Sequence, residues 1–81
     1  MNLHLTERLR KSYEVAPPQV QRAFDKQSRL LAQNLGHPSL RAKKFDERRG
    51  IWRARVNRDW RFYFTIETDA YIIIGLTRHP K

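Results

Sequence analysis

The stretch of residues 51–66 alternates between apolar and polar side chains on both sides of a short polar turn at residues 57–59. A period of two is typical of β-strands that bury one face, so the stretch predicts a β-hairpin. Its apolar face would carry Trp52, Ala54 and Val56 from the first strand and Trp60, Phe62, Phe64 and Ile66 from the second. This face can cover a hydrophobic core, and we expect both tryptophans to pack there in preference to stacking on nucleobases.

The opposite face of the hairpin is strongly basic. It carries Arg53, Arg55 and Arg61, with Tyr63 and Thr65 beside them. A single arginine on an exposed strand face often serves only solubility. Three on one small sheet repel one another and lower stability, so a bound polyanion explains the cluster better. The hairpin therefore predicts a surface for nucleic acid.

The composition agrees with a nucleic-acid partner. The chain has 81 residues, with 17 Lys+Arg against 8 Asp+Glu and a formal net charge of +9, and its pI is about 10.9. Such a charge is the electrostatic footprint of nucleic-acid-binding domains. A membrane surface would also attract it, but the basic groups lie on predicted strands and not on an amphipathic helix with a free apolar face. The length allows one small domain, residues 1–81.

The absence of cysteine excludes several kinds of chemistry. Without cysteine there is no disulfide framework, thiolate nucleophile or cysteine metal site. His4, His37 and His79 are too scattered to suggest metal ligation, so we expect neither a metal nor a cofactor. The first residues lack the continuous apolar stretch of a signal peptide, and no segment is apolar enough to span a bilayer. We expect a cytoplasmic protein with no membrane partner.

Two helices are predicted before the hairpin and one strand after it. Thr6 is the expected N-cap of the first helix, and Pro17 and Pro18 end this helix and begin the next, for which Gly36 is the expected C-cap. Residues 40–50 should form a charged connector anchored by Phe45, residues 71–76 a strand and residues 2–5 a possible edge strand. The predicted class is α+β: two N-terminal helices packed on one face of a small twisted antiparallel sheet of three principal strands, with a bare basic surface opposite.

Four motifs keep a recognisable order along the chain: HPSLRAKKF at 37–45, GIWRARV at 50–56, DWRFYF at 59–64 and IIIGLTRH at 72–79. With the two preceding helices, this order resembles the RelE/ParE superfamily of type II toxin–antitoxin toxins over nearly the whole chain. The strand arginines resemble the RelE-like branch. The resemblance implies the fold described above. Toxins of the RelE branch cut mRNA in the ribosomal A site, those of the ParE branch poison DNA gyrase, and a cognate antitoxin wraps either kind.

The resemblance also implies roles for particular residues. In RelE-type enzymes a ribose 2′-hydroxyl attacks the adjacent phosphate, so the site must hold the phosphate, take one proton and give another. Arg61 would bind the phosphate, and His79 would transfer protons. The residues expected to take part in catalysis are Arg61, His79 and Arg55. Those expected to bind RNA are Arg53, Lys43, Lys44, Arg78 and Tyr63. Asp46 or Glu47 is an alternative general base.

Two departures from the family pattern keep other functions open. Arginines stand where some active relatives have lysines, and arginine is a very poor proton acceptor. Many relatives present a stacking tyrosine beyond the position of His79, where this sequence has Pro80 and Lys81, so Tyr63 is the expected substitute. The main hypothesis is a toxin that cleaves mRNA on the ribosome, with an acidic or amphipathic antitoxin as its partner. The alternatives are a ParE-like gyrase inhibitor and a catalytically impaired antitoxin-binding module.

Overall fold

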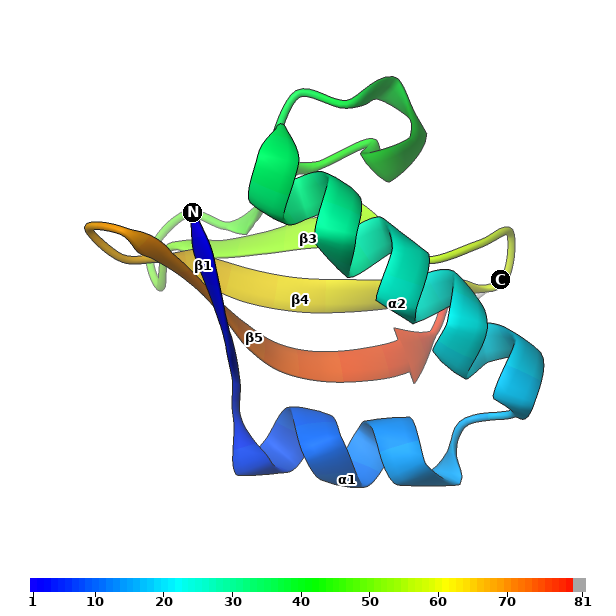
Figure 1. Cartoon of the computed structure of the whole chain (residues 1–81). Coiled ribbons are helices and arrows are strands. Elements are labelled where there is room, and N and C mark those ends of the chain that lie inside the picture. Colours follow the sequence, from blue (N-terminus) through cyan, green and yellow to red (C-terminus); the bar gives the residue numbers. More distant parts are fainter. Residues whose placement is uncertain (80–81) are drawn as a thin grey trace.

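The computed structural model of the chain describes residues 1–79, in which two helices pack against one five-stranded sheet (Figure 1). The strands are β1 (Asn2–Leu5), β2 (Lys43–Asp46), β3 (Ile51–Arg55), β4 (Trp60–Ile66) and β5 (Ala70–Arg78). They lie in the order β1-β5-β4-β3-β2. The helices are α1 (Glu7–Val15) and α2 (Pro18–Gln33), and a short 3-10 helix, η1, spans Pro38–Leu40. The predicted α+β class is confirmed.

The sheet is larger than expected and is mixed, so the prediction of a purely antiparallel sheet is wrong. β1 pairs in parallel with the first half of β5, from Ala70 to Ile73, whereas the other neighbours are antiparallel. The possible edge strand at residues 2–5 is therefore real. β2 lies within the stretch expected to be a connector. Its sequence, Lys-Lys-Phe-Asp, lacks the alternation that identified the hairpin, because an edge strand buries little of either face.

The helix boundaries follow local hydrogen bonds. Thr6 caps α1 as predicted, with its side chain accepting a bond from the backbone N–H of Leu9. The second helix ends at Gln33 with Asn34 as its C-cap, so the expectation that Gly36 caps it is wrong. Asn34 accepts the Gly36 N–H through its side chain, which lets the chain turn without a left-handed glycine.

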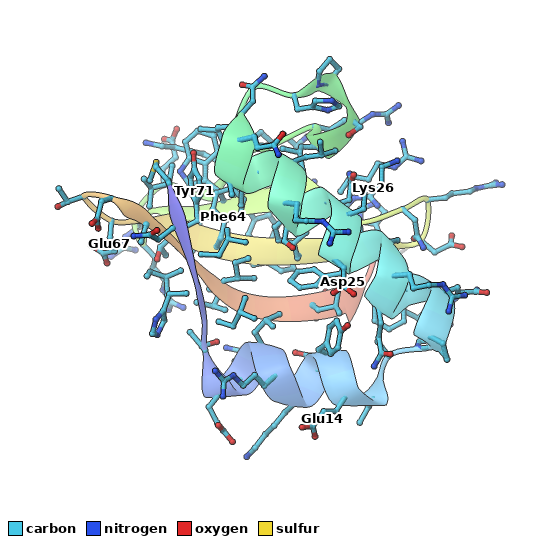
Figure 2. The ribbon with its side chains drawn as sticks, viewed as in Figure 1. Glu14, Asp25, Lys26, Phe64, Glu67 and Tyr71 are labelled. Carbon is cyan, nitrogen blue, oxygen red and sulfur yellow. The ribbon has the colours of Figure 1, made fainter. Side chains whose placement is uncertain are left out.

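The core lies between α2 and the sheet, which α2 crosses diagonally (Figure 1). Phe24 of α2 meets Phe62 of β4 edge to face, with ring centroids 5.3 Å apart. α1 packs along β5, and Tyr13 of α1 donates to the Asp25 carboxylate of α2 at 3.0 Å. Figure 2 shows Asp25 between the two helices, and Phe64 on the central strand β4. Among residues 1–79, no helix is long and apolar enough to cross a membrane.

The anchor of the stretch between α2 and β3 is Leu40 and not Phe45. Leu40 is fully buried, whereas Phe45 is 55% exposed. A bulge in β2 between Lys44 and Asp46 interrupts the regular pairing with β3. Lys43 pairs with Arg53 on the open face. The alternation of a strand puts Phe45, two residues further on, on that same face, where its ring meets Tyr63. The expected role of Phe45 in the core is therefore corrected.

Candidate nucleic-acid interface

The pairing of β3 with β4 places the three hairpin arginines on one face. Arg55 lies opposite Arg61 and Arg53 opposite Tyr63, while the alternate residues Ala54 and Phe62 are buried. Directly paired residues project from the same face of a sheet. The shared basic face expected from the alternation is therefore present, on the side of the sheet away from α2.

These arginines surround a hollow of about 280 Å³, which we call the first hollow. Its lining comprises Arg41, Lys43, Arg53, Ala54, Arg55, Arg61 and His79. No acidic residue is among these lining residues, and the only ion pair within residues 1–79 lies elsewhere, between Arg49 and Asp46 at 3.8 Å. Several positive side chains thus lie around one concavity, and no carboxylate of residues 1–79 forms an ion pair with them. Such a place attracts anions strongly, because the surrounding protein focuses the field.

Arg61 is held more firmly than the sequence suggested. We expected a solvent-facing guanidinium, but Arg61 is half-buried, and its Nη1 donates to the carbonyl oxygens of Asn57 at 2.7 Å and Trp60 at 2.9 Å. Burial lowers the pKa of Arg61, and the nearby Arg55, Arg53 and Arg41 lower it further. The lowered pKa means that burial and the neighbouring cations destabilise the charged guanidinium of Arg61. An anion bound in the hollow would stabilise that charge. Arg61 therefore both fixes the β3–β4 turn and contributes charge to the hollow.

His79 is fixed at the end of β5 by its backbone. Its N–H donates to the Asp59 carbonyl in the β3–β4 turn at 2.6 Å, which brings the imidazole to the first hollow. Within the described part of the chain, its buried Nδ1 has no hydrogen-bond partner. Burial lowers the pKa of His79, and Arg61, Arg53 and Lys43 lower it further. A lowered pKa favours the neutral imidazole, which is the form able to accept a proton.

Three of the sequence-predicted residues lie outside the first hollow. Lys44 pairs with Trp52 and Arg78 pairs with Trp60, so both project from the face opposite the hairpin arginines. We expected both to bind RNA with those arginines, and this placement does not bring them together. The reason is the two-residue period of strands, since Lys44 and Arg78 are each one residue out of phase. Tyr63 is on the correct face but lines a neighbouring hollow of about 540 Å³.

The acidic candidates for a general base are also placed elsewhere. Asp46 lines the neighbouring hollow and pairs with Arg49, both through the ion pair and by accepting the Arg49 backbone N–H at 3.2 Å. Glu47 is exposed in the β2–β3 turn. Neither lines the first hollow. Within residues 1–79, no group of three or more His, Asp or Glu side chains could hold a metal ion.

Two residues of the interface were not predicted to belong to it. Arg41 lines the first hollow and has a left-handed backbone, with φ 46° and ψ 41°. Phe45 lies edge to face on Tyr63 at 5.1 Å, and the Arg53 guanidinium sits 5.2 Å from its ring centroid. An exposed aromatic ring beside a cationic hollow is a stacking surface for a base. A lone phenylalanine in a basic segment was the only available signal, because the strand β2 that sets its direction was not recognised from the sequence.

Comparison with known proteins gives likeness in structure alone. No protein-family model matches the sequence, and no curated protein does. Among solved structures, a YoeB/ParE toxin from Agrobacterium tumefaciens is similar with a TM-score of 0.82 at 15% identity, covering 99% of this chain and 100% of that one. The toxin–antitoxin complex RelBE2 from Mycobacterium tuberculosis gives 0.80 at 16%, covering 96% of each chain. YafQ from E. coli gives 0.78 at 14%, covering 96% of this chain and 92% of that chain. The chain therefore has the fold of the YoeB and RelE toxins.

Proposed function

We propose that the protein is the toxin of a type II toxin–antitoxin system and acts as an endoribonuclease on mRNA bound to the ribosome. The observation that carries the proposal is the first hollow, where five cationic side chains surround the imidazole of His79. A phosphodiester fits such a place electrostatically, and the imidazole, whose pKa is lowered there, supplies a group that can accept a proton. The likeness to YoeB, RelE and YafQ structures supports the same class of function.

The chemistry needs no group beyond the RNA and these side chains. The ribose 2′-oxygen attacks the adjacent phosphorus while His79 takes the 2′-hydroxyl proton as general base. A new bond from the 2′-oxygen to phosphorus forms, and the bond from phosphorus to the 5′-oxygen breaks. The departing oxygen takes a proton and becomes a 5′-hydroxyl, and the other fragment ends in a 2′,3′-cyclic phosphate. Lys43 is the lining cation best suited to give that proton, because an ammonium group releases one more readily than a guanidinium.

The arginines stabilise the extra negative charge of the phosphorane. Arg53 and Arg55 project from β3 into the hollow, and a planar guanidinium can bind two phosphate oxygens at once. Arg61 already gives Nη1 to backbone carbonyls, so its charge and its remaining N–H groups serve the phosphate. Phe45, next to Arg53, offers a surface on which a neighbouring base can stack. This assigns Phe45 the stacking role that was expected of Tyr63.

The same positive charges indicate what kind of antitoxin would bind this protein. A chain with a net charge of +9 and an uncompensated basic face would be neutralised by an acidic or amphipathic segment laid over that face. Several similar solved structures are themselves toxin–antitoxin complexes. An antitoxin that covers the first hollow would block RNA by competition.

The decisive experiment compares His79→Gln with wild type in cells after controlled induction. Wild type should stop translation and leave mRNAs cut within codons, as read by primer extension. His79→Gln should cleave about 10²–10⁴-fold more slowly. His4→Gln is the matched control, since His4 is exposed on β1 and lines neither the first hollow nor its neighbour. Induction that produces cleaved gyrase complexes would favour the ParE-like alternative. Unhindered growth with the soluble wild-type protein would favour the antitoxin-binding module.

The pH dependence tests the proton-transfer role separately. A general base must be unprotonated, so the cleavage rate falls as pH drops through the pKa of His79. Because that pKa lies below its usual 6.5, the midpoint of the fall should lie below pH 6.5. Single-turnover cleavage on programmed ribosomes measures the profile. His79→Gln should lose this limb and His4→Gln should keep it. An unchanged profile in His79→Gln would remove the imidazole from the mechanism.

A further inference from the structure

A second hollow, of about 460 Å³, adjoins the first on the α2 side of β3. The two share Arg41 and Arg55, so the basic lining continues from one to the other. Lys26 of α2, labelled in Figure 2, and Arg58 of the β3–β4 turn bring the cations of the second hollow to four. No acidic residue lies among its described lining residues. This clustering costs stability through repulsion, as it does in the first hollow.

The second hollow also has an apolar part to its lining. Ala23 of α2, Pro38 of η1 and Val56 after β3 line it together with the cations. Apolar surface ringed by cations suits a nucleotide, whose base and ribose have apolar faces and whose phosphate is charged. A bare phosphate would gain nothing from the apolar part. The hollow is open to solvent at its rim, which is the condition for a strand to pass through it.

The junction between the two hollows is rigidly built. Gln27 of α2 donates through Nε2 to the Ser39 carbonyl at 3.1 Å and to the Arg55 carbonyl at 2.9 Å, which ties α2 to η1 and β3. Arg41 follows η1 immediately and is the only non-glycine residue with positive φ among residues 1–79. A left-handed conformation costs a non-glycine residue free energy and often marks a functional position. Here it presents Arg41 to both hollows.

We propose that the second hollow, with its cations Lys26, Arg41, Arg55 and Arg58, binds the RNA strand just beyond the dinucleotide that contains the scissile phosphate. The inference rests on the proposed function, because the first hollow must hold the scissile phosphate. The strand then crosses from the open face to the α2 side over Arg41 and Arg55. RNA is favoured over an acidic peptide, because repeated phosphates match a continuous line of cations and the nucleoside matches the apolar part of the lining.

The test uses 2′-O-methyl oligoribonucleotides, which lack the attacking hydroxyl and cannot be cut. Wild type should bind a hexanucleotide more tightly than a dinucleotide at low salt, measured by calorimetry or fluorescence anisotropy. The Lys26→Ala/Arg58→Ala double variant should weaken hexanucleotide binding by about tenfold or more and leave dinucleotide binding nearly unchanged. The slope of log K against log salt should also fall for the hexanucleotide alone. The matched control is Arg22→Ala/Arg48→Ala, which removes two exposed charges from α2 and from a turn without touching either hollow.

Three results would overturn the inference in different ways. Equal losses in the test and control variants would show a general effect of net charge. Equal wild-type affinity for both oligonucleotides would contradict the second hollow alone, provided that dinucleotide binding still depends on Arg55. Binding of neither oligonucleotide would contradict the proposed function and the inference with it. An oligoglutamate peptide that binds in preference to RNA, with the same dependence on Lys26 and Arg58, would reassign the hollow to an acidic protein segment.

Discussion

The two faces of the β3–β4 hairpin contain neighbouring residues of the same strands but have opposite effects on stability. On the α2 side, Ala54, Phe62 and Phe64 are buried and pack into one core. On the open side, Arg53, Arg55 and Arg61 crowd together around the first hollow, where the described lining offers no carboxylate. Burial of the first face stabilises the fold, and repulsion on the second opposes it. The core therefore maintains an arrangement of charges that would not form by itself, and this is how a site becomes preorganised for an anion.

The largest expected effect is on the core face. Phe62→Ala should lower the free energy of unfolding by about 3–5 kcal/mol, because Phe62 is fully buried and contacts Phe24. Tyr63→Ala, the next residue on the open face, is the matched control and should lose about 1–2 kcal/mol. Urea denaturation measures both. If Phe62→Ala does not fold, Phe62→Leu should fold and still lose more than about 0.5 kcal/mol. Equal losses at the two positions would contradict the difference between the faces.

The next effect concerns the link that joins the core to the basic surface. Gln27→Met keeps the volume but removes both donated hydrogen bonds, leaving the carbonyls of Ser39 and Arg55 without this donor. We expect a loss of about 1–3 kcal/mol in unfolding free energy. Amide NMR shifts should change at Arg41 and Arg55, which flank the junction. Gln33→Met, at the exposed end of α2, is the control and should change neither measurement. A stable variant with unshifted signals would show that Gln27 does not position the cations.

The features that follow from local sequence patterns could be predicted, whereas those that depend on tertiary structure could not. The alternation of residues 51–66 was enough to identify both faces of the hairpin, and the Thr6 cap and the two prolines located the helices. The β2 strand was missed, because four residues at an edge bury too little to leave a pattern. No strand phase for Lys44 and Arg78 could be taken from the sequence, and their pairs put them on the face opposite the hairpin arginines. Arg41, Phe45 and the second hollow depend on a left-handed residue, an edge strand and the packing of α2 on the sheet, none of which a local pattern specifies.

A smaller effect on stability is expected from the left-handed backbone of Arg41, at the junction of the two hollows. Arg41→Gly and Arg41→Ala both remove the charge, but the glycine variant should be more stable by about 1 kcal/mol, because only glycine adopts φ 46° without steric cost. The control pair is Arg29→Gly and Arg29→Ala in α2, where glycine should be the less stable by about 1 kcal/mol. Thermal and urea unfolding give the two differences. The same sign at both positions would show that Arg41 is not strained, which would weaken the case for a functional reason behind its conformation.

The smallest effect is the most direct test of repulsion on the open face. Arg55→Gln removes one charge opposite Arg61 and keeps most of the side chain. At low salt we expect it to be as stable as wild type or more stable, by up to about 0.5 kcal/mol, since a repulsive pair is lost. High salt screens the repulsion, so the difference should shrink as salt is added. Arg48→Gln, exposed in the β2–β3 turn and away from the first hollow, should show less dependence on salt. If Arg55→Gln is instead clearly destabilised, and more so at low salt, then Arg55 makes a favourable electrostatic contact in the free protein. In that case the arginines of the open face would not destabilise the free protein by repulsion. The contrast in stability between the two faces would then be contradicted at Arg55, the residue shared by both hollows.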